Sequence, residues 1–480
     1  MRGVWTVDRI RAAEQAAFTR IPESTAMRRA AFAVAGEVAA LLTERTGGIA
    51  GRRVALLVGA GNNGGDALWA GAFLRRRGAA VTAVLLAPDR AHAAGLAALR
   101  RAGGRIADPS AETDLARADA VVDGIVGLSA RGPLRPVAAR LVDLAAAPVV
   151  AVDLPSGADP DTGAIDGPAV HAAVTVTFGG LKPVHVIGPG AIACGRVRVV
   201  DVGIDAELGS PDAVLLDAAD VGAAWPVPGP DDDKYSQGVT GVAAGSATYP
   251  GAAVLATGAA VLATSGMVRY AGTAVDAVRA RWPETVATGS VADTGRVQSW
   301  VVGPGLGTGT ASREVLARVL ADGVPVCADA DAITLLAEDP GLWEKRDPGT
   351  PVVLTPHDRE FARIAGEVGA DRIAAARGAA ESMGAVVLLK GHSTVVAAPD
   401  GRVLIDKSQS AWPATAGSGD VLSGLIGALL AAGLDPWLAA GCATHVHGLA
   451  ADIAATGAPA PASYLLAAVP AAIRRVRAAS

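Results

Sequence analysis

The sequence predicts an α/β protein with two domains, for three reasons. The chain has 480 residues, more than one compact domain usually holds. Short apolar runs alternate with helical stretches along most of its length, a pattern typical of doubly wound parallel sheets. This alternation breaks once, at the proline-rich and then acidic residues 225–234 (WPVPGPDDDK). We therefore expect a first domain over 1–215, a linker over 216–233 and a second domain over 234–480.

The elements of the first domain follow in order. Residues 1–50 have a helical pattern that ends at Gly47-Gly48. Residues 52–59 (RRVALLVG) form a continuous apolar run, as expected of a strand inside a parallel sheet. A glycine-rich loop, GAGNNGGD, follows over 59–66 and leads into a helix that ends near Gly78. Further strands are predicted over 80–86, 118–123, 148–153, 172–178 and 196–202.

The second domain shows the same alternation. Its predicted strands cover 238–245, 297–303, 324–328, 352–355, 385–390 and 393–398. The uncharged run 251–268 consists mostly of Ala, Gly, Thr and Ser, so it predicts a buried core helix rather than a membrane span. Late in this domain, ATAGSGDVLSG at 414–424 predicts a glycine turn that opens another buried helix.

Composition and charge narrow the possible functions. The formal net charge is −5, which argues against a surface for nucleic acid or an anionic membrane. Cys194, Cys327 and Cys442 lie far apart and form no metal or redox motif, so we expect buried thiols in a reducing compartment. The N-terminus carries charges where a signal peptide would have its apolar core. We therefore expect a cytoplasmic protein with no nucleic-acid or membrane partner.

The loop at 59–66 formally matches the GxGxxG pattern of dinucleotide-binding folds, which alone is a weak signal. The ribose-binding carboxylate expected about 20 residues later is missing from a clear strand end, and Asp89 is a poor candidate for it. Asp66, inside the loop, would also repel a pyrophosphate. A simple Rossmann oxidoreductase is therefore disfavoured.

Polar side chains gather at the ends of three predicted strands. Asn63 follows the first, Asp123 ends the second, and Asp153 ends the third with Ser156 close behind. The carboxyl ends of parallel strands form the binding crevice of such sheets. Asp, Asn, Ser and Gly are common in turns, so each loop alone is explained as an ordinary turn. The three loops together favour a single binding site. Asp153 is the candidate acid/base; Lys182 is a second candidate that could also contact phosphate, and we expect an exposed lysine there.

The turn at 414–424 is the main candidate site of the second domain. Helix N-termini bind anions, and Gly417 and Gly419 let the backbone approach one closely. Asp420 lies in the same turn. A carboxylate beside an anion site is what phosphoryl transfer to a hydroxyl needs. The residues alone also allow Asp420 to be a helix cap.

The histidines and the absence of a P-loop motif say less about function than the turn at 414–424 does. No GxxxxGK[ST] sequence occurs, so the chain is not a P-loop enzyme. His357 stands between a predicted strand and Glu360, and it is either a ligand-binding or a structural residue. His445 and His447 are two residues apart on a predicted helix and cannot share a face, so we interpret both as structural.

The motifs GAGNNGGDA, VDGIVGLSARGP and VAVDLPSGADPDTG, with WTVDRIRAAE near the N-terminus, resemble the NAD(P)H-hydrate epimerase family over about residues 1–210. The resemblance implies a Rossmann-like doubly wound fold, Asp153 as catalytic acid/base, and a potassium ion (K⁺) held by Asn63, Asp123 and Ser156. Ala67 departs from the family, which usually has Gly there. The residues implied to contact the hydrated nucleotide are Asn62, Asn63, Gly64, Gly65, Asp66, Gly127, Leu128, Ser129, Ala130, Arg131, Gly132 and Pro133.

The motifs KYSQGVTGVAAGSATYPGAAVL, VVGPGLG, DADA, LTPHDREFARI, LLKGHST and TAGSGDVLSGL resemble, in the same order, the ADP-dependent NAD(P)H-hydrate dehydratases over about 230–480. The resemblance implies a ribokinase-like α/β fold, Mg²⁺, and Asp420 as catalytic base. Arg359 and the approach SQSAWP at 408–413 depart from the family pattern. The residues implied to contact the hydrate are Ala253, Gly305, His357 and Asp420, and those implied to hold ADP are Lys390, Gly391, His392, Ser393, Thr394 and Gly419.

Together the two resemblances imply a bifunctional repair enzyme for nicotinamide nucleotides. It would epimerise the R and S hydrates and dehydrate the S form with ADP, with NADHX, NADPHX and ADP as small-molecule partners and a homo-oligomeric assembly. One alternative is a ribokinase-like small-molecule kinase with an accessory N-terminal domain, which would leave the set of Asn63, Asp123 and Ser156 unexplained. Another is an N-terminal domain that binds ligand without catalysis.

Overall fold

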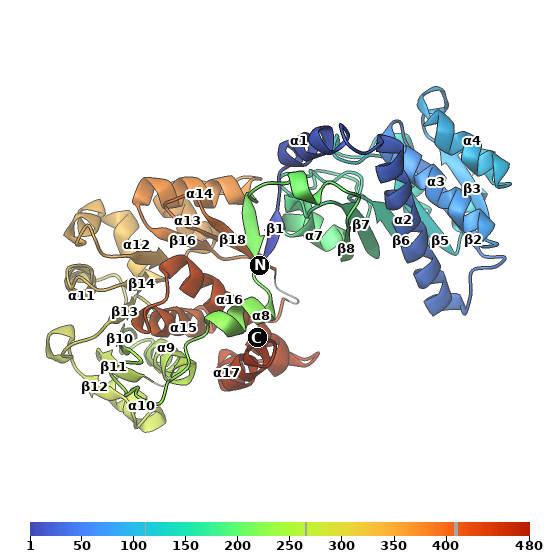
Figure 1. Cartoon of the computed structure of the whole chain (residues 1–480). Helices are drawn as coiled ribbons and strands as arrows, with labels where there is room; N and C mark the ends of the chain where they lie inside the picture. Colours follow the sequence, from blue (N-terminus) through green and yellow to red (C-terminus); the bar gives the residue numbers. More distant parts are fainter. Residues whose placement is uncertain (111, 265, 408–410) are drawn as a thin grey trace. The chain divides into compact units, whose positions relative to one another are not determined.

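The computed structural model describes residues 1–110, 112–264, 266–407 and 411–480. It contains two compact units, here called the N-terminal unit (3–212) and the C-terminal unit (213–480 with 1–2). Each unit combines helices with a central sheet (Figure 1). The boundary between the two units, after residue 212, lies close to the predicted end of the first domain at 215 and upstream of the predicted linker. Part of that linker forms helix α8 (Ala218–Ala224), which packs against α17 (Ala462–Arg477).

The N-terminal unit contains a seven-stranded sheet in the order β4-β3-β2-β5-β6-β7-β8, and every pair is parallel. The order reverses between β2 and β5, and such switch points are where open α/β sheets bind ligands. The chain begins with β1 (Arg2–Val4). The strands of this unit are β2 (Arg53–Val58), β3 (Ala80–Leu85), β4 (Arg105–Ala107), β5 (Ala120–Gly124), β6 (Val149–Val152), β7 (Val174–Phe178) and β8 (Arg196–Val200). Its helices are α1 (Val7–Ala17), α2 (Glu23–Thr46), α3 (Asn62–Arg76), α4 (Ala93–Arg101), α5 (Glu112–Ala116), α6 (Pro136–Asp143) and α7 (Gly188–Ala193).

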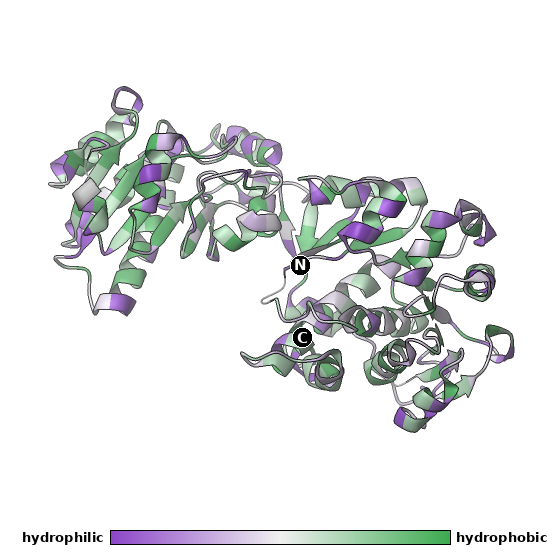
Figure 2. Cartoon of the chain, turned by 180° about the vertical axis from the view of Figure 1, so that it is seen from behind, coloured by the Kyte–Doolittle hydropathy of each residue, from purple (hydrophilic) through white to green (hydrophobic). Residues whose placement is uncertain are grey.

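Both faces of this sheet are covered, which explains why its strands are continuous apolar runs. On β2, Val54 and Leu56 pack into a core shared with α2 and α3, whereas Leu57 faces a separate core that contains Leu141 of α6. Successive strand residues point to opposite faces, so both sets must be apolar. Figure 2 shows this as apolar colouring along the strands of both units. The predicted Rossmann-like, doubly wound arrangement is therefore confirmed.

The C-terminal unit contains a mixed sheet with the order β9-β18-β17-β16-β15-β14-β13-β10-β11-β12. Neighbouring strands are parallel through one part of this sheet, which contains β12, β11, β10, β13, β14, β15 and β16. Strand β17 is antiparallel to both of its neighbours. The strands are β9 (Ala213–Leu215), β10 (Val239–Ala243), β11 (Met267–Ala271), β12 (Val286–Thr288), β13 (Ser299–Val302), β14 (Val326–Ala328), β15 (Val352–Leu354), β16 (Val386–Leu389), β17 (Ser393–Ala397) and β18 (Val403–Lys407). The remaining helices are α9 (Pro250–Ala263), α10 (Val275–Arg281), α11 (Thr310–Leu320), α12 (Asp331–Glu338), α13 (Asp358–Ala365), α14 (Arg372–Met383), α15 (Ser418–Ala431) and α16 (Pro436–Ala455).

The uncharged run at 251–268 supplies two elements rather than one. Helix α9 ends at Ala263, and the last residues of the run begin β11. Helix α9 is buried against α15, as its small side chains predict. In the described part of the chain, none of the helices combines the length and the apolar character that crossing a membrane requires. Cys194, Cys327 and Cys442 are buried free thiols, as expected.

Candidate active sites

A cavity of about 1380 Å³ opens at the carboxyl edge of the N-terminal sheet, at the switch point between β2 and β5. The loops that follow these two strands form much of its wall, and Asp153 and Lys182 reach it from the ends of β6 and β7. The structure therefore brings most of the expected nucleotide contacts into one cavity. The predicted residues that line it are Asn62, Asn63, Asp66, Gly127, Leu128, Ser129, Ala130, Arg131, Gly132, Pro133 and Asp153.

Gly64 and Gly65, two further predicted contacts, lie buried in the first turn of α3. A Cβ atom on Gly64 would collide with the carbonyl oxygen of Gly59, and one on Gly65 would lie 2.9 Å from the ring of His92. Both positions need glycine because other chain segments approach so closely. Gly64 lets α3 start against the end of β2, and Gly65 leaves room for His92 at the start of α4.

Asp153 and Lys182 form a buried ion pair in the cavity wall. The Lys182 ammonium lies 2.6 Å from Asp153 Oδ1 and donates to Thr177 Oγ1 at 2.7 Å. Only 1% of the Lys182 side chain is exposed, so the expectation of an exposed lysine is wrong. After β7 ends at Phe178, a turn through Gly179, which has a φ of 70°, returns the chain to the same sheet edge.

His185 fixes the backbone around this pair. Its Nδ1 accepts from the Lys182 backbone N–H at 2.9 Å, so the neutral ring carries its proton on Nε2 and donates to the Asp153 carbonyl oxygen at 2.9 Å. Asp153 has a φ of 67°, a left-handed conformation that a non-glycine residue adopts only when its surroundings hold it there. His185 thus supports both members of the ion pair.

Two more carboxyl groups face the same cavity. Burial raises the pKa of Asp66 well above its usual range, and the negative charge of Asp153 adds to this effect. Burial and Asp153 also raise the pKa of Glu14, which lies on α1. Glu14 was not among the predicted site residues. Its only signal in the sequence is its place at the end of the WTVDRIRAAE motif.

The predicted cation site lies beneath the cavity. Asp123 is fully buried and accepts from the Ser156 hydroxyl at 2.7 Å and from the Ser156 backbone N–H at 2.8 Å. Burial raises the pKa of Asp123 to about 6, against the lowering effect of these bonds. A Cβ atom on Gly127 would lie 2.9 Å from Asn63 Oδ1, so the Asn63 amide packs on the loop after β5. Among the described residues no ion pair neutralises Asp123. The oxygen atoms of Asp123, the Ser156 hydroxyl and the Val126 carbonyl lie together, and hard cations prefer such ligands.

In the C-terminal unit, Asp420 lies in the first turn of α15. Gly417 precedes the helix with a φ of 84°, as expected of the predicted glycine turn. Burial raises the pKa of Asp420 to about 7; the carboxylate of Asp329 adds to this effect and the ammonium of Lys390 opposes it. A carboxyl group that titrates near neutral pH can accept a proton at little cost, as a general base requires.

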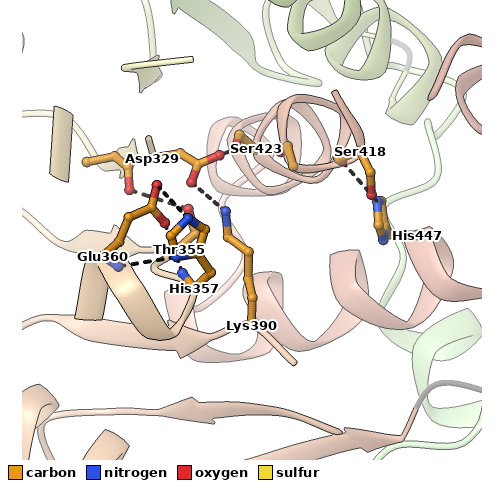
Figure 3. A network of polar contacts seen from close by, with 10 residues as sticks. Asp329, Thr355, His357, Glu360, Lys390, Ser418, Ser423 and His447 are labelled. Carbon is orange, nitrogen blue, oxygen red and sulfur yellow. Dashed lines mark hydrogen bonds and ion pairs between the residues drawn. The ribbon is translucent and has the colours of Figure 1, made fainter. Parts of the chain in front are cut away.

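Asp329, Lys390 and Ser423 come from different elements and meet at α15, as Figure 3 shows. Asp329 follows β14 and is 1% exposed. Its Oδ1 lies 2.7 Å from the Lys390 ammonium, and its Oδ2 accepts from the Ser423 hydroxyl of α15 at 2.7 Å. The sequence placed Asp329 at a strand end but gave it no role, and Ser423 was missed. Helical spacing was the available signal, since Ser423 lies three residues after Asp420.

Of the residues predicted to hold ADP, Lys390 belongs to this cluster and Gly419 borders it. A Cβ atom on Gly419 would lie 3.3 Å from Lys390 Nζ, so glycine leaves the ammonium close to the helix backbone. Arg372 supports the loop after β16, since its guanidinium donates to the Lys390 carbonyl oxygen at 2.8 Å. His392 is exposed, Ser393 begins β17, and the Thr394 hydroxyl donates to Gly391 at 3.3 Å. Residues 408–410 of the unusual approach to α15 lie outside the described residues.

The predicted hydrate contacts lie at the start of α13, in the loop after β13 and on α9. His357 is the N-cap of α13: its Nδ1 accepts from the Glu360 N–H at 3.2 Å, while half of its side chain remains exposed. Gly305 has a φ of 60°, and a Cβ atom there would lie 2.8 Å from Ala252 Cβ. Ala253 is fully buried on α9, the helix that packs against α15.

The other histidines have partners of their own. His447 Nε2 lies 3.0 Å from the Ser418 hydroxyl at the start of α15, and burial lowers the pKa of His447 to about 4. His445 Nδ1 lies 3.1 Å from Asp406. His447 therefore secures the beginning of α15, in keeping with the structural interpretation.

Comparison with known proteins found matches in both parts of the chain. The family model described as NAD(P)H-hydrate dehydratase matches residues 240–471, and that described as YjeF-related protein N-terminus matches residues 24–184. The bifunctional NAD(P)H-hydrate repair enzyme Nnr of Mycobacterium tuberculosis is 58% identical over 439 residues, which cover 90% of each chain. The ADP-dependent (S)-NAD(P)H-hydrate dehydratase of Neisseria meningitidis is 40% identical over 259 residues, which cover 52% of this chain and 87% of that one.

A solved structure supports the fold of the C-terminal unit. A ribokinase-like superfamily protein from Enterococcus faecalis matches with a TM-score of 0.50 and 23% identity, and the match covers 55% of this chain and 96% of that chain. At this identity the likeness concerns the fold alone. The long match to the mycobacterial enzyme decides the family: the chain belongs to the bifunctional NAD(P)H-hydrate repair enzymes.

Proposed function

We propose that the two units repair hydrated nicotinamide nucleotides in sequence. The N-terminal unit interconverts the R and S hydrates, and the C-terminal unit dehydrates the S hydrate with ADP, giving NAD(P)H, AMP and phosphate. The observation that carries this proposal most directly is the Asp420 carboxyl group, with a pKa raised to about 7 by burial, at the N-terminus of a helix and close to Lys390. A plain small-molecule kinase would leave the cavity around Asp153 without a purpose.

Epimerisation uses the ion pair of Asp153 and Lys182. The lone pair of the ring nitrogen expels the hydroxyl group from the adjacent carbon. A proton from the ion pair of Asp153 and Lys182 converts that group to water. Water then adds to the opposite face of the iminium carbon and returns a proton to the pair. The proton leaves the Lys182 ammonium through the Asp153 carboxyl group, which exchanges it with the substrate, and it returns to the Lys182 amine by the same route. Thr177 orients the Asp153 carboxylate.

A potassium ion fits beside this reaction. Asn63, Asp123 and Ser156 would hold it through oxygen atoms, and the ion would neutralise the buried Asp123 carboxylate and attract the substrate phosphates. Asn62, Asp66 and the loop 127–133 bind the nucleotide along the cavity.

Dehydration uses Asp420 as the base. Its carboxylate takes the proton from the ring hydroxyl, whose oxygen attacks the β-phosphorus of ADP while the bond to the AMP oxygen breaks. Phosphate then leaves the ring with the hydrogen of the neighbouring carbon as a proton, and the double bond is restored. Lys390 and the N–H groups of the turn at Gly417–Gly419 stabilise the transferred charge. Mg²⁺ would accompany ADP, because this ion usually binds through substrate phosphates.

The remaining ligand contacts follow the same assignment. ADP lies along Lys390, Gly391, His392, Ser393, Thr394 and Gly419, and the hydrate contacts Ala253, Gly305 and His357. The protein acts in the cytoplasm as a homo-oligomer, on NADHX and NADPHX. The buried free thiols are consistent with a reducing compartment.

The test uses the full chain and separated hydrates. Purified S hydrate is incubated with ADP and Mg²⁺, and the absorbance of the reduced nicotinamide is followed together with AMP. Stoichiometric formation of both supports the dehydratase assignment, and no NAD(P)H from intact protein would refute it. For the first unit, conversion of R to S hydrate is measured with wild type and Asp153→Ala. Equal rates would refute the catalytic role of Asp153.

A further inference from the structure

We propose that Asp329 is a positioning residue for the dehydration: its carboxylate holds the Lys390 ammonium against the first turns of α15, so that the phosphate-binding cation and Asp420 share one site. This inference rests on the proposed function of the C-terminal unit. Asp329 itself contacts neither the hydrate nor ADP in this assignment. It acts through Lys390 and through α15.

The contacts of Asp329 join two elements that are far apart in the sequence. One oxygen lies 2.7 Å from Lys390 Nζ, after β16, and the other accepts from Ser423 Oγ, on α15, at 2.7 Å. Figure 3 shows Lys390 extending toward α15, where it meets this carboxylate. Asp329 therefore fixes the distance between the loop that holds ADP and the helix that holds Asp420.

The burial pattern shows why Lys390 stays available to a ligand. Asp329 is 1% exposed, whereas 23% of the Lys390 side chain is exposed. A Cβ atom on Gly419 would lie 3.3 Å from Lys390 Nζ and 3.5 Å from Asp329 Oδ2, so the absence of a side chain keeps this space open. One face of the ammonium is thus held by protein, and the rest of the group borders the N-terminal turn of α15. That turn is where an anionic phosphate binds favourably.

The same arrangement sets the charge around Asp420. Burial raises the pKa of Asp420, the carboxylates of Asp329 and Asp331 raise it further, and Lys390 lowers it. His447 of α16 faces the same turn, but burial lowers its pKa to about 4, so it is neutral at pH 7. Helix α9, which also packs on α15, contains no charged residue. Asp329 and Lys390 are therefore the two charges with the largest effect on the protonation of Asp420.

Replacing Asp329 with Asn has two consequences that act in the same direction. One negative charge near Asp420 disappears, and the positive charge of Lys390 is no longer neutralised by Asp329. Both changes favour the ionised form of Asp420 and lower its pKa. The substitution also loosens the cation that must meet the β-phosphate of ADP.

The experiment compares wild type, Asp329→Asn, Asp329→Glu and Ser423→Ala as full chains. It measures kcat and the KM for ADP at several pH values with S hydrate, the Kd for ADP by calorimetry, and R-to-S epimerisation as a control for intact protein. For Asp329→Asn we expect kcat to fall about tenfold or more, and the acidic limb of the kcat profile to move to lower pH. Asp329→Glu should restore the wild-type acidic limb and part of kcat, because it restores the charge.

An Asp329→Asn enzyme with wild-type kcat and an unchanged acidic limb would overturn the proposal. If this variant does not fold, Ser423→Ala decides, since it removes one bond to Asp329 and leaves every charge in place. A severalfold loss of kcat or of ADP affinity then supports the positioning role, and wild-type values overturn it. Failure of the proposed function can be distinguished from failure of this inference, because in the first case the wild-type protein would form no NAD(P)H from S hydrate and ADP.

Discussion

The two sites use the same pair of residue types in different ways. In the N-terminal unit the buried lysine is bonded to the proposed acid/base itself, with Lys182 Nζ 2.6 Å from Asp153. In the C-terminal unit Lys390 is bonded to Asp329, at 2.7 Å, and the proposed base Asp420 accepts no hydrogen bond from any other described side chain. Each lysine follows the carboxyl end of a strand that pairs in parallel with a neighbour, Lys182 after β7 and Lys390 after β16.

The difference matches the two reactions that we propose. Epimerisation returns to its starting protonation after every turnover, so a proton that is shared within an ion pair can be given and recovered. Dehydration needs a base that takes a proton from a hydroxyl group and a separate cation for phosphate. A lysine bonded directly to Asp420 would hold its carboxylate ionised but would make it a weaker base. Because Lys390 is bonded to Asp329 instead, the base and the phosphate-binding cation lie close together without forming an ion pair with each other.

The largest expected effect is the separation of the two activities by Asp420→Asn. The amide cannot accept the hydroxyl proton, so ADP-dependent formation of NAD(P)H should fall by about 10²–10⁴. Epimerisation should stay at the wild-type rate, and the Kd for ADP, measured by calorimetry, should change little. A variant that retains dehydration would show that Asp420 is not the base.

The second effect concerns the ion pair of the first site. Lys182→Met leaves Asp153 buried without its cation, so we expect a loss of about 3–5 kcal/mol in the stability of the N-terminal unit, with a large loss of R-to-S conversion. Thr177→Val is the matched control, because it removes one hydrogen bond to Asp153 and no charge. Denaturant unfolding and epimerisation rates measure both. Equal effects of the two variants would contradict a special role for the lysine.

The third prediction is a pH dependence that belongs to the C-terminal unit. The ionised form of Asp420 is the base, and burial raises its pKa to about 7. Dehydration under saturating substrates should therefore increase about tenfold per pH unit below pH 7 and level off above it. A rate that is flat between pH 5 and 8, with chemistry shown to be rate-limiting, would contradict Asp420 as the base.

The smallest effect concerns the backbone. Both sites contain a left-handed residue, Asp153 with a φ of 67° and Gly417 with a φ of 84°. Gly417→Ala should destabilise the C-terminal unit by about 1–2 kcal/mol, because its Cβ would also lie 2.6 Å from Leu255 Cδ1. Gly378→Ala in α14, where a Cβ meets no atom within 4 Å, should be neutral or stabilising. Thermal unfolding compares the two, and a similar Tm for both would argue against strain at Gly417.

The fold could be predicted further than the sites. Buried parallel strands such as β2 and β5 are continuous apolar runs, so their positions follow from the sequence to within a residue or two. The short strands β4 and β12 gave no such signal, because three residues cannot show a period. The run at 251–268 appeared uniform, although its last residues pair as β11 instead of extending α9.

The site residues that lie in glycine loops at strand ends were identified as a group, because parallel strands bring their carboxyl ends together. The sequence could not show which charged side chains contact one another. Lys182 is separated from Asp153 by 29 positions, and its burial depends on the turn after β7. Asp329 and Ser423 are 94 positions apart, and only the packing of α15 makes their contact visible.

The most direct test of the central claim uses an equal mixture of R and S hydrates with excess ADP and Mg²⁺, followed by NAD(P)H absorbance. Wild type should convert the whole mixture. After subtraction of an enzyme-free control, Asp153→Ala should stop once the S hydrate is consumed, and Asp420→Asn should form no NAD(P)H while it still equilibrates the hydrates. Complete conversion by Asp153→Ala at the wild-type rate would contradict the division of labour between the two units.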